Sequence, residues 1–183
     1  ALCMGNVAIV DLLVSKGTNI ASSSEDGDSL LLLACERGNY DMAAILLSKG
    51  ANVSDMNSKG DTPLILACRE GNQALAELLV AHGANVNLRD KNKNSPLILA
   101  TKAGSEPIVK LLLNHGACTD DQNDIGRSAI HYAAEDGRES IVECLLEAGA
   151  SVVISDSYGR TPWRLALCMG NVAIVDLLVS KGT

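Results

Sequence analysis

Glycine recurs along this 183-residue chain at a spacing of 33 residues, in two separate series. The first series comprises Gly5, Gly38, Gly71, Gly104, Gly137 and Gly170, and the second comprises Gly17, Gly50, Gly83, Gly116, Gly149 and Gly182. A fixed period of this length is typical of chains that stack small units, each of which contacts only its neighbours. The period therefore argues against the one or two compact domains that length alone would suggest.

Each period carries signals for two helices and a polar connection. The apolar residues of segment 74–80 recur at intervals of three and four, which is helical spacing, and a glycine of the second series can close such a helix. Hydroxyl–proline pairs at 62–63, 95–96 and 161–162 suit the N-cap and first position of a preceding helix. The remaining stretches are rich in Asn, Asp, Ser and Gly, which favours a turn or hairpin over a third helix.

These motifs resemble those of ankyrin repeats. A Thr-Pro-Leu element is followed by a glycine nine residues after its threonine, then by an apolar helix ending in Leu-Leu, and then by a Gly-Ala-x-Val element such as 83–86. The resemblance covers essentially the whole chain and implies an all-α fold, an ankyrin-repeat α-solenoid of helix-turn-helix units joined by β-hairpin-like loops. We expect a single domain, 1–183, with a partial repeat 1–23, repeats 24–56, 57–89, 90–122 and 123–155, and an incomplete terminal repeat 156–183.

Some positions depart from the family pattern. Lys93 stands where other units carry a turn glycine, and only His131 keeps the histidine of the family's Thr-Pro-Leu-His motif, where it could bond Ser128. Ile65 and Ile98 cannot form the hydrogen bond that this histidine usually makes. We expect these changes to affect local stability and not the fold.

A single unit cannot bury its own apolar stripe, so neighbouring units must cover it. The core is expected to include a set of apolar residues and their counterparts in other units, namely Leu64, Leu66, Ala67, Leu75, Leu78 and Leu79. Alignment with Leu64 also places Trp163 in the core.

Charge and composition exclude several classes of protein. The net charge of -7 argues against bulk binding to nucleic acid or to an anionic membrane, and the apolar runs are too short to span a bilayer. The six cysteines follow the repeat and lack zinc spacing, which favours reduced, structural thiols and an intracellular, cytoplasmic location, with the nucleus also open. No signal peptide is visible at the start of the sequence.

Catalysis finds little support in the sequence. The chain contains no nucleophile elbow, phosphate-binding loop, metalloprotease motif or dinucleotide fingerprint. His82 and His115 each precede a capping glycine, where a cation suits the negative end of a helix. We expect no enzyme activity, no cofactor and no metal.

Binding is the better-supported function. The resemblance implies that partners bind the concave side, formed by the hairpin tips and the exposed face of the first helices. Carried over by alignment, the predicted partner-binding residues are Asp28, Glu36, Lys59, Asp61, Arg69, Arg89, Lys91, Asn92, Lys102, Ile125, Arg127, Glu135, Asp136, Tyr158 and Arg160. The sequence thus predicts a protein–protein interaction scaffold for a protein or peptide ligand.

Charge is unevenly distributed along the units. Units 24–56 and 123–155 each carry six acidic and two basic side chains, whereas the two central units are neutral. The predicted concave positions of the central units are nevertheless basic, at Lys59, Arg69, Arg89, Lys91 and Lys102. This pattern predicts a basic centre flanked by acidic ends, suited to an acidic or phosphorylated segment; the alternative is a mixed surface kept for solubility.

Ile125 and Tyr158 lie one period apart and are therefore expected on neighbouring hairpin tips. Two exposed apolar groups there could form a binding hot spot, or they could pack on each other and brace the hairpins. We favour binding, and both interpretations stay open.

Residues 1–18 recur letter for letter as residues 166–183, an offset of five periods. Half-units of identical sequence at both ends would present the same surface. The alternative function is therefore head-to-tail self-association, in which one chain's terminal half-unit displaces residues 1–18 of the next and continues the stack.

Overall fold

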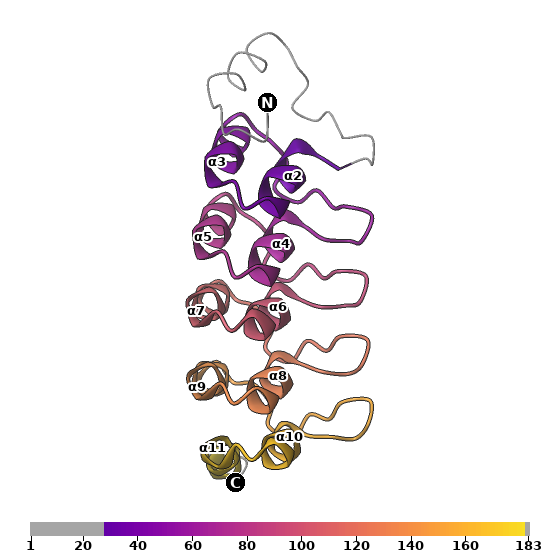
Figure 1. Ribbon diagram of the computed structural model, residues 1–183, viewed down its shortest axis with the longest axis vertical. Helices are drawn as coiled ribbons and strands as arrows, with labels where there is room; N and C mark the ends of the chain where they lie inside the picture. Colours follow the sequence, from indigo (N-terminus) through magenta and orange to yellow (C-terminus); the bar gives the residue numbers. More distant parts are fainter. Residues whose placement is uncertain (1–27, 182–183) are drawn as a thin grey trace.

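The computed structural model describes residues 28–181, and within that range ten helices follow one another as five stacked pairs (Figure 1). The pairs are α2 (Leu30–Glu36) with α3 (Tyr40–Ser48), α4 (Pro63–Arg69) with α5 (Gln73–Ala81), α6 (Pro96–Ala103) with α7 (Glu106–Asn114), α8 (Ala129–Glu135) with α9 (Glu139–Glu147), and α10 (Pro162–Met169) with α11 (Val172–Lys181). First helices stack on first helices and second on second, so the expected all-α solenoid is confirmed. The boundaries assigned to the units stay a prediction.

Local capping explains where the helices begin and end. The Thr62 side chain accepts a hydrogen bond from the backbone N–H of Ile65, and Pro63 follows it at the first helical position. Asn39 and Asn72 cap the second helices α3 and α5 in the same way. In the described part of the second glycine series, at 50, 83, 116 and 149, φ lies between 79° and 88°. These residues therefore close the helices as predicted.

The core runs through the whole stack between the two layers of helices. Leu64, Leu66, Ala67, Leu75 and Leu79 are buried, which confirms that part of the expected core. Leu78 was also expected to be buried in the core, but it is only half-buried and packs against the core cluster.

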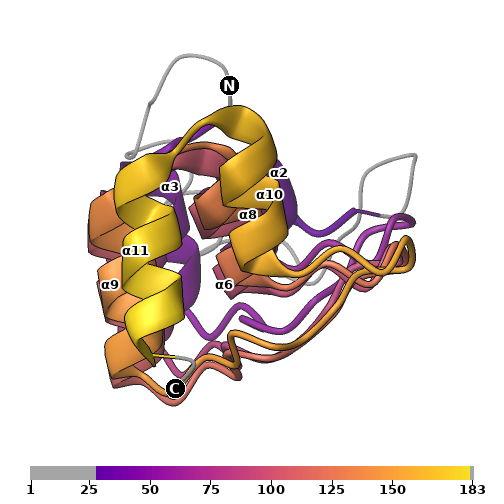
Figure 2. The ribbon, with the colours of Figure 1, turned by 90° about the horizontal axis from the view of Figure 1, so that it is seen from below.

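Trp163 also differs from the expectation, because 42% of its surface is exposed. The equivalent residues Leu31, Leu64, Leu97 and Ile130 are at most 1% exposed. Each of those side chains lies on a first helix that has a further pair stacked on it, whereas α10 lies at one end of the described stack (Figure 2). Alignment identified the column correctly, but burial depends on the neighbouring pair.

The polar connections all project to the same side of the stack (Figures 1 and 2). Successive connections are linked by single backbone hydrogen bonds, for example from the Lys91 N–H to the Lys59 carbonyl at 3.1 Å and from the Asp124 N–H to the Asn92 carbonyl at 3.0 Å. Lys93 takes the left-handed conformation, with φ 59°, that glycines adopt at equivalent positions. The departure from glycine therefore leaves the shape of the turn unchanged.

Units that lack the family's histidine differ only locally from the unit that keeps it as His131. The Ser128 hydroxyl lies 2.9 Å from Nδ1 of His131, as predicted, and Nε2 of His131 lies 3.2 Å from the Arg160 carbonyl of the next connection. At Ile65 and Ile98 the preceding hydroxyl instead accepts the backbone N–H of the isoleucine. The helix start is therefore capped in all three units.

Candidate binding surface

The connections project to one side of the stack, and side chains at the C-terminal ends of the first helices reach towards them; we call this side the hairpin–helix face. It comprises residues 58–61, 91–94, 124–127 and 157–160 together with residues 36, 69, 102 and 135. Of the sequence-predicted residues, the exposed ones are Glu36, Lys59, Arg89, Lys91, Asn92, Lys102, Ile125, Asp136 and Tyr158, and the half-buried ones are Asp28, Arg69, Glu135 and Arg160. Asp61 and Arg127 are buried.

A central groove of about 660 Å³ opens on this face between two successive connections and helices α4 and α6. Four of the five predicted basic residues line it, namely Lys59, Arg69, Lys91 and Lys102. The fifth, Arg89, lies outside the groove, with its guanidinium 3.7 Å from Asp121. Two buried carboxylates, Asp61 and Asp90, also line the groove.

Arg69 is fixed in the floor of the groove by these carboxylates. Its Nη1 donates to Oδ2 of Asp61 at 2.8 Å, and its Nη2 lies 2.5 Å from Oδ1 of Asp61 and 3.5 Å from Oδ2 of Asp90. Burial by itself would raise the pKa of Asp61, but the Arg69 guanidinium outweighs it and holds that pKa below its ordinary value. Asp61 was expected on the partner-binding surface, but the residue is only 1% exposed and its carboxylate accepts from Arg69.

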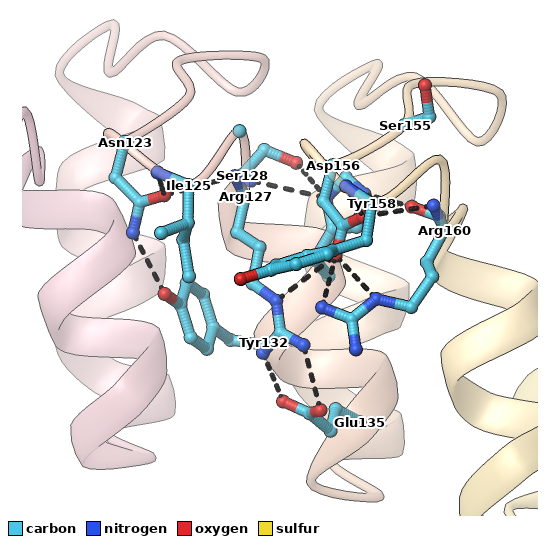
Figure 3. A network of polar contacts seen from close by, with 12 residues as sticks. Asn123, Ile125, Arg127, Ser128, Tyr132, Glu135, Ser155, Asp156, Tyr158 and Arg160 are labelled. Carbon is cyan, nitrogen blue, oxygen red and sulfur yellow. Dashed lines mark hydrogen bonds and ion pairs between the residues drawn. The ribbon is translucent and has the colours of Figure 1, made fainter.

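An equivalent ion pair two units further along has the opposite polarity (Figure 3). Arg127 takes the position of Asp61 and donates to Glu135, which takes the position of Arg69. Arg127 also lies 3.4 Å from Asp156, which in turn accepts a hydrogen bond from Nε of Arg160 at 2.9 Å. Arg127 was expected on the surface, but it is only 8% exposed because these carboxylates enclose it.

The two ion pairs decide which charges reach solvent. In each pair the residue in the connection is buried and the residue at the helix end is partly exposed, with 36% of the Arg69 side chain and 27% of the Glu135 side chain accessible. At the intermediate and preceding units the same position holds Lys102 and Glu36, both exposed. The residues at this position in successive first helices, Glu36, Arg69, Lys102 and Glu135, form a column that is acidic, basic, basic and acidic in turn.

Sequence reasoning missed Asp90, which lines the groove, and Tyr132, which contacts a lysine of the groove. Asp90 accepts the backbone N–H groups of Asn92 and Asn94 and so shapes the connection. Asn57, Asn123 and Asp156 do the same at 33-residue intervals, a series visible in the sequence. Tyr132 is 9% exposed, and Nζ of Lys102 lies 5.1 Å from its ring centroid. No spacing signal links Tyr132 to Lys102, because they belong to different units.

Ile125 and Tyr158 lie on neighbouring connections, with 42% and 71% of their surfaces exposed. The Ile125 carbonyl accepts a hydrogen bond from the Ser157 N–H at 3.0 Å. The Arg160 guanidinium lies 4.7 Å from the ring centroid of Tyr158 and leaves most of the aromatic side chain accessible (Figure 3). The choice between a hot spot and mutual bracing stays a prediction.

The family model described as "Ankyrin repeats (3 copies)" matches this chain at residues 1–90, 83–156 and 118–183. The chain belongs to the ankyrin repeat family. Ankyrin repeats are in general protein–protein interaction modules, and the family is typically a non-enzymatic scaffold. Comparison with curated proteins finds no match.

Within the described residues of this ankyrin-repeat chain, no three His, Cys, Asp or Glu side chains are grouped so that they could hold a metal ion. The longest helix there, α11, has 10 residues, whereas about 20 are needed to cross a bilayer. Five cysteines are described, and all are free thiols. Burial raises the pKa of Cys35 to about 12, so this thiol stays protonated and unreactive at neutral pH.

Proposed function

We propose that this ankyrin-repeat chain is a scaffold that binds a partner protein or peptide on the concave side, at the hairpin–helix face. An acidic or phosphorylated segment of the partner occupies the central groove. The observation that carries this proposal is the gathering of Lys59, Arg69, Lys91 and Lys102 around one groove in a chain whose net charge is -7. The free, buried thiols Cys35 and Cys68 support an intracellular location for this function, cytoplasmic or nuclear.

The flanking charges support the same assignment. Glu36 precedes the groove along the column of helix ends, and Glu135 and Asp136 follow it. A partner with an acidic segment in the middle and basic residues on either side would match this order and be oriented by it. Ile125 and Tyr158, beyond the groove, would contact apolar side chains of the same partner.

The experiment begins with photo-crosslinking in a cell extract. A photoreactive residue is placed at Asn92, on the groove, and as a matched control at Glu143, which is exposed on α9. The association rate of the identified partner is then measured with Lys59, Lys91 and Lys102 changed to glutamate. Arg69 is left unchanged, because a glutamate there would face Asp61 and Asp90 and destabilise the fold.

We expect crosslinks from position 92 and not from 143, and an association rate that falls by about tenfold or more at low salt. High salt should reduce that difference, because it screens exposed charges. Crosslinks that come only from position 143, or an unchanged association rate, would show that the partner binds elsewhere.

Head-to-tail self-association is the second candidate, and a specific observation favours it. Trp163 and Leu167 are 42% and 55% exposed, although the equivalent residues Leu64 and Cys68 are completely buried by the next pair of helices. The α10–α11 surface therefore has the composition of an interior contact. Residues 1–18, whose sequence it repeats in part, lie outside the described residues, so their role in the hypothesis rests on sequence identity.

Light scattering over a range of concentrations tests this candidate. We expect the average mass to rise with concentration, and Leu167→Glu to reduce the rise because a charge cannot be buried at such a contact without a partner. The emission of Trp163, the chain's single tryptophan, should shift to the blue as association proceeds. A strictly monomeric chain at high concentration would rule the candidate out.

A further inference from the structure

We infer that the central groove binds a phosphate monoester dianion carried by a side chain of the partner, in preference to a carboxylate. This inference rests on the proposed function and adds the chemical class of the group that the groove recognises. Three observations support it: the net charge of the residues around the groove, the positions of the four cations on different segments, and Asp90, whose carboxylate lowers that net positive charge.

The charges of the lining residues match a dianion. Lys59, Arg69, Lys91 and Lys102 contribute four positive charges, and Asp61 and Asp90 contribute two negative charges. The groove therefore keeps two net positive charges. A single carboxylate would neutralise one of them, whereas a phosphate monoester near pH 7 carries up to two negative charges and three acceptor oxygens.

The cations come from four different segments, and contacts position the charged groups of two of them, Arg69 and Lys102. Arg69 at the end of α4 is fixed by Asp61, and Lys102 on α6 lies over the Tyr132 ring. Lys59 and Lys91 belong to successive connections, which the 3.1 Å backbone bond between these two residues joins. A ligand with several oxygens can therefore be contacted from more than one side, and Arg69 and Lys102 lose little side-chain freedom on binding.

Asp90 limits the positive charge of the groove, and the turn that it shapes needs its Oδ1 acceptor and not its negative charge. Its Oδ1 accepts the N–H groups of Asn92 and Asn94 at 2.9 Å and 2.8 Å. The side-chain oxygens of Asn57 and Asn123 accept the equivalent two bonds in other units. Asp90→Asn therefore keeps the acceptor that the turn needs and removes one negative charge from the groove, at the loss of the contacts that Oδ2 makes with Arg69 and with the Asn94 amide.

The rest of the surface favours a protein as the carrier of the phosphate. Glu36 and Glu135 flank the groove on either side along the column of helix ends. A nucleic acid has a phosphate at every nucleotide and would meet these carboxylates as soon as it left the groove. A phosphorylated peptide brings its charge to one point and avoids this repulsion.

The test uses the full chain labelled with ¹⁵N and three peptides that differ at one position. A short Gly/Ser peptide carries phosphoserine, glutamate or serine at its centre, and binding is followed by amide chemical shifts at constant ionic strength. An oligothymidylate of similar length, at about 0.15 M salt, represents nucleic acid. The protein variants are Lys102→Gln, Asp90→Asn and, as a control, Lys110→Gln, because Lys110 lies on α7 outside the groove and pairs with Glu106 at 2.6 Å. Melting temperatures check that each variant folds.

We expect the phosphoserine peptide to give saturable shifts at Lys59, Lys91 and Lys102, with a dissociation constant in roughly the millimolar range, and the glutamate peptide to bind about fivefold more weakly. Lys102→Gln should weaken binding about threefold, Asp90→Asn should strengthen it by a similar factor, and Lys110→Gln should change nothing.

Equal binding of the phosphoserine and glutamate peptides, or equal losses from Lys102→Gln and Lys110→Gln, would overturn the assignment to a phosphate group. Tighter binding of the oligonucleotide than of the phosphoserine peptide would overturn the assignment to a protein partner. If the crosslinked partner depends on the groove lysines but no phosphoserine peptide binds, the scaffold function stands and the phosphate assignment fails. If crosslinks arise only from the outer helices, the proposed function itself fails.

Discussion

At the scale of single residues, the charge that a partner meets depends on which member of each ion pair is buried. Asp61 and Arg127 occupy equivalent positions in the connections, carry opposite charges and are both buried. Their partners at the helix ends, Arg69 and Glu135, stay partly exposed. Exchanging the two charges between connection and helix end would therefore leave an ion pair in place but reverse the charge that the face presents.

Asp156 should make stability depend on acidic pH. Burial alone would raise its pKa, but hydrogen bonds from Arg160 and from backbone N–H groups lower it from an ordinary 3.8 to about 2. Below pH 4 the unfolded chain therefore takes up a proton before the folded chain does, and stability is lost progressively as the pH falls from about 4 to 2. Because Arg160 is partly exposed, we expect a contribution on the order of 1–2 kcal/mol.

Asp156→Asn isolates this contribution in urea denaturation at several pH values. The variant keeps an acceptor for the turn, as Asn123 does, but carries no charge. It should be less stable than the parent chain at pH 7, and the two should converge towards pH 2. A constant difference across this range would contradict the assigned pKa.

Two neighbouring leucines on α5 differ in burial and should therefore differ in how much each stabilises the fold. Leu79 is completely buried, so Leu79→Ala should cost ~2–5 kcal/mol in the free energy of unfolding. Leu78 is half-buried, so Leu78→Ala should cost about 1 kcal/mol. Chemical denaturation measures both, and equal losses would contradict the burial described for this helix.

At the scale of elements, the helices were predictable and the contacts of the connections only partly so. Thr62 with Pro63, and the glycine that follows α5, are local signals, so the sequence located both helices of the unit. The partners of Asp61 and Arg127 lie eight residues away, beyond the reach of helical spacing rules. Opposite charges at that separation in two units were the available signal for buried pairs.

Stacking between connections should make one glycine far less replaceable than its neighbour. A Cβ added at Gly126 would lie 2.7 Å from the backbone nitrogen of Ser157, whereas at Gly159 it would meet nothing within 4 Å. Both residues have positive φ, of 73° and 70°, so alanine costs about 1–2 kcal/mol of backbone strain at either position.

Gly126→Ala should therefore lower the melting temperature by about 3 °C or more beyond the loss caused by Gly159→Ala, since it also forces two connections apart. Thermal unfolding followed by circular dichroism measures the difference. Identical losses would mean that the contact between the connections carries no stability.

At the scale of the whole molecule, the 33-residue period made the architecture predictable, because each unit repeats the same local signals and must cover its neighbour. The resemblance to ankyrin repeats, carried over by alignment, also picked out the four cations that line the groove. It could not predict the exposure of Trp163, since a column in the alignment records the type of residue and not the presence of a following pair. The local stability of each pair of helices should likewise depend on whether it has a neighbouring pair on both sides.

Hydrogen exchange should reveal that distribution. Within residues 28–181, helices α6 and α8 have a further pair on both sides, whereas α10 and α11 have one on a single side and leave Leu167 and Val179 more than half exposed. In a one-dimensional stack each missing interface lowers local stability, so the terminal pair opens without the rest. We expect amides of α11 to exchange about tenfold faster or more than those of α8, after correction for intrinsic rates.

A phosphoserine peptide bound in the central groove should slow exchange in α4 and α6 and leave α11 unchanged, because stabilisation passes only through contacts between neighbours. Uniform protection along the chain would mean that the whole stack unfolds as one cooperative unit.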